Sequence, residues 1–262
     1  MGPNLEGSVA LVTGGSREIG AAIAAALASA GAAVLIGHHG EAELAETIAE
    51  TIRARGGRAV AHEADLRLLT ETEAIVAQAV AAFGRLDICV ANAGVTVWGR
   101  FLEYSEAKWD AVADLNLKGS FFLAQAAARQ MIRQGSPGSI LFSSSIAGHR
   151  VLPGLAAYGA TKAALSHLAR CLAVELAPHR IAVNAIGIGP TLNARNLADD
   201  PDYDRHWGAV SPAGRAARPE DIAGAALFAV TTPYVTGTTL MVDGGWTAQA
   251  PLPPMDFLGA KG

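Results

Sequence analysis

The sequence has few of the features that mark proteins built around disulfides, metals or nucleic acids. Its only two cysteines, Cys89 and Cys171, lie within apolar runs, so we expect neither a disulfide framework nor a thiolate metal site. No cluster of His, Asp, Glu or Cys has metal-ligand spacing. Lys and Arg number 20 against 24 Asp and Glu, and they form no dense basic block that would follow a phosphate backbone. We therefore expect no metal and no nucleic acid as a partner.

The sequence also lacks recognisable targeting segments. The first residues, MGPNLEGS, include neither a basic nor an apolar signal region, and Glu6 departs from the myristoylation pattern. The 19 residues from Ile19 to Gly37 carry no charge, which approaches the length of a membrane span. Gly31 interrupts this run, and a β-favouring segment follows it, so a helix, a turn and a buried strand are expected instead. We expect a cytoplasmic protein with no membrane partner.

Seven short apolar runs alternate with helical stretches rich in Ala, Leu and Glu. The runs are SVALV, AAVLI, RAVAH, LDICVA, SILFS, IAVNAI and TTLMV. Each is too continuously apolar to have a solvent-exposed face, which favours a parallel sheet covered on both sides. The alternation predicts a single α/β domain over residues 1–262, with a doubly wound, parallel, seven-stranded sheet of Rossmann type and helices on both faces. Ligands bind such sheets at the carboxyl ends of the strands, where we expect the functional residues.

The first of these positions is the stretch TGGSREIG, residues 13–20. Gly14, Gly15 and Gly20 stand between a predicted strand and a predicted helix. Free N–H groups and the helix macrodipole favour an anion there, and a nucleotide phosphate is the natural candidate. On the glycines alone, a tight turn that binds no ligand remains the alternative.

Glu18 is an unexpected acid within this turn. A carboxylate about 5 Å from a phosphate would cost roughly 3 kcal/mol at an effective dielectric near 20. We therefore predict that the Glu18 side chain points outward, toward Arg195 and Arg205.

A second candidate site is the stretch YGATK, in a helix predicted over residues 156–176. Tyr158 and Lys162 are four residues apart and share a helix face, so the ammonium can lower the pKa of the phenol and make it a general acid or base. Ser145 follows a predicted strand, and its hydroxyl can hydrogen-bond a substrate oxygen. A chance Tyr-Lys spacing and a helix-capping serine are the alternatives.

These motifs occur in an order that resembles the short-chain dehydrogenase/reductase family in its compact single-domain form. The likeness covers roughly residues 5–246 and rests on TGGSREIG, ADL, ANAG, NLKG, SSSIAG, YGATK, VNAI and VTGTTLMVDGGW. The resemblance implies an NAD(P)-dependent oxidoreductase that moves hydride between the coenzyme and a carbonyl or secondary alcohol. Glu18, and Ile188 in place of the usual proline, leave open a catalytically weak member that serves as a nucleotide-binding sensor or scaffold.

The resemblance also assigns roles to individual residues. It makes Tyr158 the acid/base, with Lys162 lowering its pKa and holding the nicotinamide ribose, Ser145 orienting the carbonyl and Asn116 supporting a proton-relay water. Asp65 is expected at the adenine edge. Because the family tolerates Ala at the position of Glu18, the resemblance also implies that this residue does not need a positive φ. The full coenzyme-binding set that we predict is Gly14, Ser16, Arg17, Ile19, Gly20, His38, His39, Asp65, Leu66, Asn92, Ala93, Gly94, Tyr158, Lys162, Gly189 and Thr191.

The coenzyme preference depends on the end of the second strand, which reads LIGHHGE. An acid there would bind a ribose 2′-hydroxyl and repel a 2′-phosphate, but His38 and His39 occupy the position. Arg17 resembles the basic residue that NADP-using relatives place near the 2′-phosphate. NADP(H) is therefore favoured, while the nearby Glu41 keeps NAD(H) as the alternative.

The substrate wall is expected around three segments, including a loop over about residues 190–212. The residues expected to line it are Trp98, Ala147, His149, Leu152 and Trp207. We expect a small ketone or alcohol as the substrate. The family resemblance and the apolar faces of SFFLAQAAARQM and AALSHLARCLAVEL indicate a homotetramer. The tail from about residue 247 to residue 262 is expected to be either a mobile end or a strap across a neighbouring subunit.

Overall fold

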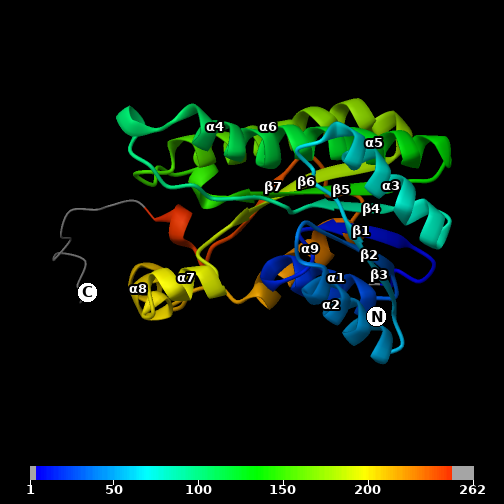
Figure 1. Ribbon diagram of the computed structural model, residues 1–262, viewed down its shortest axis with the longest axis horizontal. Helices are drawn as coiled ribbons and strands as arrows, with labels where there is room; N and C mark the ends of the chain where they lie inside the picture. Colours follow the sequence, from blue (N-terminus) through cyan, green and yellow to red (C-terminus); the bar gives the residue numbers. More distant parts are fainter. Residues whose placement is uncertain (1–3, 250–262) are drawn as a thin grey trace.

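A central parallel sheet organises the computed structural model, which describes residues 4–249. The strand order is β3-β2-β1-β4-β5-β6-β7, so the order reverses between β1 and β4 (Figure 1). Each strand pairs with its neighbours in parallel register; for example, Leu11 lies opposite both Leu35 and Cys89. The strands are β1 (Val9–Thr13), β2 (Ala33–His38), β3 (Arg58–Glu63), β4 (Ile88–Ala91), β5 (Gly138–Ser145), β6 (Ile181–Ile188) and β7 (Thr239–Val242).

The helices cover both faces of this sheet. One face carries α3, α5 and α6, and the other carries α1, α2 and α9 (Figure 1). The α-helices are α1 (Glu18–Ser29), α2 (Ala42–Ala54), α3 (Leu69–Phe83), α4 (Glu106–Val112), α5 (Ser120–Arg133), α6 (Ala156–Leu176), α7 (Ala194–Asp199), α8 (Tyr203–Val210) and α9 (Pro219–Thr231). A π-helical stretch, η2 (Ala113–Gly119), joins α4 to α5, and short 3-10 turns are η1 (Phe101–Glu103), η3 (Ile146–Gly148), η4 (Ala177–His179) and η5 (Trp246–Ala248).

The two-sided burial follows from the alternation of side chains along each strand. Leu11 and Leu35 pack with the helices of one face, while Val12 and Ile36 pack with those of the other. All residues of β1 and β2 are buried. The predicted doubly wound α/β fold is therefore confirmed, and the uncharged run at residues 19–37 forms α1 and β2.

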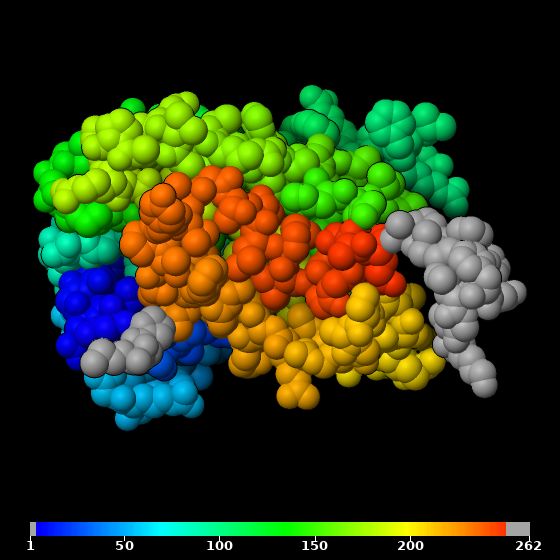
Figure 2. All heavy atoms as spheres, turned by 180° about the vertical axis from the view of Figure 1, so that it is seen from behind, coloured from blue at the N-terminus to red at the C-terminus, as the bar shows by residue number. Residues whose placement is uncertain are grey.

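The loop between β6 and α9 lies at one end of the molecule and contains α7 and α8. In the rear view, this yellow segment lies beside the red segment that follows β7 (Figure 2). Trp207 of α8 and Trp246 of η5 make the contact, with ring centroids 5.9 Å apart. Of the helices formed by residues 4–249, none is long and apolar enough to cross a bilayer. Of the tail expected over about residues 247–262, residues 250–262 lie outside the described range, while Thr247 and Ala248 belong to η5.

Candidate active site

A cleft of about 980 Å³ opens at the carboxyl ends of the strands, beside the switch point between β1 and β4. The glycine-rich turn, the end of β2, the segment after β4 and the start of α7 form its walls. Of the predicted coenzyme-binding residues, those that line it are Gly14, Ser16, Arg17, Ile19, Gly20, His38, His39, Asp65, Leu66, Asn92, Ala93 and Gly94. These residues come from distant parts of the sequence, and the fold brings them into one cleft.

Four predicted coenzyme residues, Tyr158, Lys162, Gly189 and Thr191, do not line this cleft. Thr191 is buried, and its hydroxyl donates to the Gly189 carbonyl at 3.0 Å. A Cβ atom on Gly189 would lie 2.5 Å from the Cα atom of Asp243, so the backbone is packed closely there. Asn193, Ala194 and Arg195 line the cleft instead.

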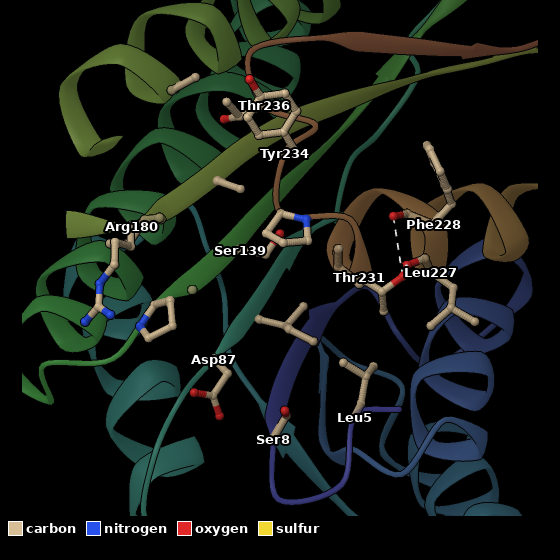
Figure 3. A pocket seen from close by; sticks show the side chains of 18 of the residues that line it. Leu5, Ser8, Asp87, Ser139, Arg180, Leu227, Phe228, Thr231, Tyr234 and Thr236 are labelled. Carbon is tan, nitrogen blue, oxygen red and sulfur yellow. Dashed lines mark hydrogen bonds between the residues drawn. The ribbon is translucent and has the colours of Figure 1, made fainter. Parts of the chain in front are cut away.

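A second, larger cavity of about 1240 Å³ lies at the opposite edge of the sheet, where Ser8, Asp87 and Ser139 stand at the amino ends of strands (Figure 3). The Asp87 carboxylate is already bound, because it accepts from the Val9 N–H at 2.9 Å and from the Arg85 guanidinium. Functional groups of parallel α/β proteins lie at the carboxyl ends of the strands. The smaller cleft is therefore the candidate active site.

The glycine-rich turn requires a close approach of backbone to backbone. A Cβ atom on Gly20 would lie 1.9 Å from the Gly14 carbonyl oxygen, a distance that no side chain permits. The turn then leads into α1, whose amino end faces the cleft with its free N–H groups. This cradle fits the phosphate of a nucleotide.

Glu18 differs from its sequence prediction in two respects. Its φ angle is 53°, so the position is left-handed, and the expectation that it needs no positive φ is wrong. Its carboxylate points outward to the loop that carries Arg195 and Arg205, as expected, but accepts from the backbone N–H of Ala194 at 2.8 Å. The two arginines have partners within their own loop: Arg195 donates to the Asn196 amide oxygen, and Arg205 pairs with Asp202.

The end of the cleft beside β2 contains several charged groups. Glu41 accepts from the Ser16 hydroxyl and pairs with the Arg17 guanidinium. Next to them, His38 is buried, and burial lowers its pKa while the Glu63 carboxylate opposes the change. Within the described chain, the His38 Nδ1 atom has no hydrogen-bond partner, which leaves a polar atom for a bound molecule.

Asp65 and Asn92 also make contacts within the protein. The Arg67 guanidinium binds the Asp65 carboxylate through two nitrogens and holds its pKa below the usual value. The Asn92 amide nitrogen donates to the carbonyls of Thr13 and Gly14, and its amide oxygen accepts from the Ser143 hydroxyl. Asn92 thus ties the glycine-rich turn to β4 and β5.

Tyr158 and Lys162 lie one turn apart on α6, as the sequence predicts. The Lys162 ammonium is 5.5 Å from the centre of the Tyr158 ring and donates to the Ser143 carbonyl at 2.7 Å. Lys162 is only 4% exposed, and burial lowers its pKa while Tyr158 opposes the shift. Ser145 is the last residue of β5, the strand whose Ser143 carbonyl binds Lys162. Its hydroxyl oxygen accepts weakly from the Ala147 N–H at 3.2 Å, which leaves its own O–H available to a substrate.

Asn116, to which the family resemblance assigns support of a proton-relay water, lies in the π-helical stretch between α4 and α5. Its amide exchanges two hydrogen bonds, both 2.8 Å, with the backbone of Val95. A Cβ atom on Gly94 would lie 3.1 Å from the Asn116 amide oxygen and 3.4 Å from the Lys162 ammonium. Glycine at position 94 therefore lets both side chains approach the same backbone segment. Single π turns occur frequently at functional sites.

The predicted substrate residues fall into two groups. Trp98 packs near Gly154, and the Gly99 N–H donates to the Gly154 carbonyl at 3.0 Å, so this segment and the loop that carries Leu152 lie together. Ala147 lies in η3, directly after Ser145. His149 contacts the Ser166 hydroxyl at 3.3 Å.

Trp207 belongs to the second group, an aromatic cluster between α8 and η5. Its ring centroid is 6.0 Å from that of Tyr203 and 5.9 Å from that of Trp246. Burial raises the pKa of Tyr203 to about 12, with smaller effects from Arg195 and Tyr158. Tyr203 was not among the residues predicted from the sequence, although its spacing of four from Trp207 would place both on one helix face.

Comparisons with known proteins decide the family. Residues 14–247 match the family model described as enoyl-(acyl carrier protein) reductase. The chain is 39% identical over 250 residues to 2-dehydro-3-deoxy-D-gluconate 5-dehydrogenase of Dickeya dadantii, covering 94% of this chain and 98% of the relative. The chain belongs to the short-chain dehydrogenase/reductase family. It is accordingly an NAD(P)-dependent oxidoreductase that interconverts a carbonyl and an alcohol.

Two further comparisons agree with this assignment. L-rhamnose 1-dehydrogenase (NAD(P)(+)) of Azotobacter vinelandii is 41% identical over 246 residues, with 90% of this chain and 94% of the relative covered. The solved structure of a short-chain type dehydrogenase/reductase from Mycobacterium marinum superposes with a TM-score of 0.88 at 34% identity, covering 94% of this chain and 98% of that one. The cleft of this short-chain dehydrogenase/reductase fits a nicotinamide coenzyme, since it joins a phosphate cradle to an unpartnered His38 nitrogen.

Proposed function

We propose that Tyr158, Ser145, Lys162 and Asn116 carry the chemistry of this oxidoreductase. The observation that carries the proposal is the buried Lys162 ammonium beside the Tyr158 ring, with Ser145 at the adjacent strand end. The coenzyme, when bound, supplies or accepts the hydride. In the reductive direction, the Ser145 hydroxyl donates a hydrogen bond to the substrate carbonyl and orients it.

In that direction, the Tyr158 hydroxyl donates its proton to the same substrate oxygen and becomes a phenolate. The Lys162 ammonium, which lies 5.5 Å from the centre of the ring, would stabilise that phenolate through its opposite charge. Asn116 holds the segment after β4 through its hydrogen bonds to Val95. The π turn around Asn116 changes the pattern of bonded backbone carbonyls, and in this way it supports a water that returns the proton to Tyr158. The oxidative direction uses the same groups in reverse.

The proposed coenzyme is NADP(H). Arg17 and His39 line the end of the cleft expected to hold the adenosine ribose, and no acid follows β2 directly. NAD(H) is the second candidate, and one contact favours it: the Glu41 carboxylate pairs with Arg17 and would repel a 2′-phosphate.

For the substrate, we propose a small hydroxylated ketone or the corresponding alcohol. Two relatives with about 40% identity are named as dehydrogenases of a sugar and of a sugar acid. Trp98 and Trp207 supply apolar surface near the site, and Arg195 supplies a positive charge at the cleft. We further propose a single catalytic domain that assembles as a cytoplasmic homotetramer.

The test is a screen of purified protein with NADPH and NADH against ketones and keto-sugars, and with NADP⁺ and NAD⁺ against polyols. Reduced-coenzyme absorbance is the measurement. We expect turnover with at least one hydroxylated compound, and loss of it in Tyr158→Phe. Measurable binding of either coenzyme without turnover of any compound would support a nucleotide-binding sensor or scaffold instead.

A further inference from the structure

We propose that Glu18 is a positioning residue that holds the start of α7 against the glycine-rich turn and thereby slows exchange of the coenzyme. The inference rests on the proposed function, because it assumes that a nicotinamide coenzyme occupies the cleft. It concerns two residues, Glu18 and Ala194, that are 176 positions apart in the sequence.

The contact joins two walls of the same cleft. Glu18 is the first residue of α1 and Ala194 is the first residue of α7, and both line the cleft. The Glu18 Oε1 atom accepts from the Ala194 N–H at 2.8 Å. A hydrogen bond in which the acceptor is ionised is stronger than one between neutral groups. Because Glu18 and Ala194 both line the cleft, a coenzyme whose phosphate lies on the glycine-rich turn must pass beside this hydrogen bond when it enters or leaves.

The other hydrogen bonds of the short helix α7 lie within its own loop, such as that from the Asn196 amide to the Thr191 carbonyl at 2.9 Å. The helix spans six residues and buries none of them. Its own cap is local, since the Asn193 side chain accepts from the Asn196 N–H at 2.7 Å. The Ala194 N–H is among the first N–H groups of the helix, which have no partner within the helix. Glu18 supplies that partner from outside the loop.

The backbone of Glu18 agrees with a role for its side chain. A non-glycine residue at a φ of 53° is uncommon and costs free energy. Such conformations persist where surrounding contacts hold them, and they cluster at ligand clamps and switch regions. Here, the contact that reaches beyond the turn is the one to Ala194.

Three variants separate the contact from the backbone strain. Glu18→Gln keeps the length of the side chain and an acceptor oxygen. Glu18→Asn tolerates the left-handed backbone but is one methylene too short to keep the same reach. Ala194→Pro removes the donor N–H and leaves Glu18 untouched.

The proline variant is unusually well suited to this fold. Position 194 is the first residue of α7, where proline is favoured because its missing N–H is not needed by the helix. The preceding residue, Asn193, is already extended at φ −152° and ψ 162°, as a residue before proline requires. Glu43→Asn, in the first turn of α2, is the matched control for the loss of an acid.

The first measurement uses the coenzyme-free protein and limited trypsin, which cleaves after Arg195 in the exposed part of α7. We expect Glu18→Asn and Ala194→Pro to be cleaved there about tenfold faster than wild type, since losing about 1.4 kcal/mol changes an opening equilibrium tenfold. Glu18→Gln should remain within about threefold, and Glu43→Asn should be unchanged. The double variant of Glu18→Asn and Ala194→Pro should be no faster than either single variant.

The second measurement is the stopped-flow dissociation rate of NADPH and of NADH. We expect the same ranking, with release about tenfold faster in Glu18→Asn and Ala194→Pro and rescue in Glu18→Gln. Unchanged cleavage and release in both disrupting variants would overturn the proposal. Faster cleavage throughout the chain with a lowered melting temperature would also overturn it, because Glu18 would then stabilise the fold generally.

The two proposals fail in distinguishable ways. If wild type binds neither coenzyme, the proposed function fails, while cleavage at Arg195 still reports whether Glu18 holds α7. If wild type binds a coenzyme and turns over a substrate but all variants release it at the wild-type rate, only the role of Glu18 fails.

Discussion

The ammonium of Lys162 lies 5.5 Å from the centre of the Tyr158 ring, on the same face of α6. The lysine is buried, so water screens its charge little. The proton donor, Tyr158, and the nearby charge, Lys162, can therefore be removed one at a time by substitution.

Removal of the Tyr158 hydroxyl should remove the proton donor alone. We expect Tyr158→Phe to lower kcat by about 100-fold or more, because general acid catalysis contributes 10²–10⁴-fold. Coenzyme affinity should stay within about threefold, since the ring remains. Tyr234→Phe is the matched control, because Tyr234 is fully exposed at the opposite edge of the sheet (Figure 3). More than about a tenth of the wild-type kcat in Tyr158→Phe would exclude Tyr158 from the role.

Lys162 should be needed for activity but not for stability. Burial lowers its pKa, which means that the fold disfavours the charged form of this side chain. We expect Lys162→Met to lose at least about 100-fold in kcat while its melting temperature equals or exceeds that of wild type. Calorimetry and steady-state kinetics measure the two effects. Lys118→Met, at a half-exposed lysine of η2, should leave both nearly unchanged, and a melting temperature well below wild type in Lys162→Met would contradict the prediction.

Arg17 and Glu41 should act in opposite directions on coenzyme choice. We expect NADPH to bind more tightly than NADH, and we expect the preference to shrink at high salt and in Arg17→Ala. Glu41→Gln should widen the preference, because it removes the carboxylate that pairs with Arg17. Fluorescence titration of both reduced coenzymes measures the ratio, with Arg53→Ala on α2 as the control. Equal affinities that Arg17→Ala does not alter would refute the proposed NADP(H) preference.

His38 should make stability depend on pH below its ordinary pKa of 6.5. Burial lowers its pKa in the folded state, so the unfolded chain binds the proton more readily between the lowered pKa and 6.5. The free energy of unfolding should therefore fall as the pH drops through this range. Urea unfolding at several pH values should show a smaller fall in His38→Asn. Identical slopes for wild type and His38→Asn would contradict the prediction.

The proposed homotetramer predicts a solution mass about four times the 26.8 kDa of one chain. Phe121 of α5 is 39% exposed and lies on one of the apolar helical faces proposed to join subunits. We expect Phe121→Arg to lower the mass seen by light scattering, because a buried charge destabilises an interface. Leu44→Arg on α2, at a comparably exposed leucine, is the control and should leave the mass unchanged. A monomeric wild-type protein would end this part of the proposal.

Local patterns in the sequence determined the sheet and the candidate catalytic pair. The seven predicted apolar runs fall on the seven strands of the sheet. The central strands β1, β2 and β4 are buried at every position, which favours apolar residues throughout, whereas the edge strands β3 and β7 are only partly buried. The predicted helix over residues 156–176 has the same bounds as α6, and the four-residue spacing alone places Tyr158 beside Lys162. The resemblance in motif order then identified the family, which the comparisons confirm.

Only the tertiary structure decided which groups meet across loops. Glu18 contacts the backbone of Ala194, not an arginine side chain, because a left-handed φ and the path of a distant loop set the direction of its carboxylate. Asn116 binds the backbone of Val95 through a π turn that leaves no simple periodic signal in the sequence. Such contacts depend on where separate segments end after folding, and spacing along the chain carries no information about that.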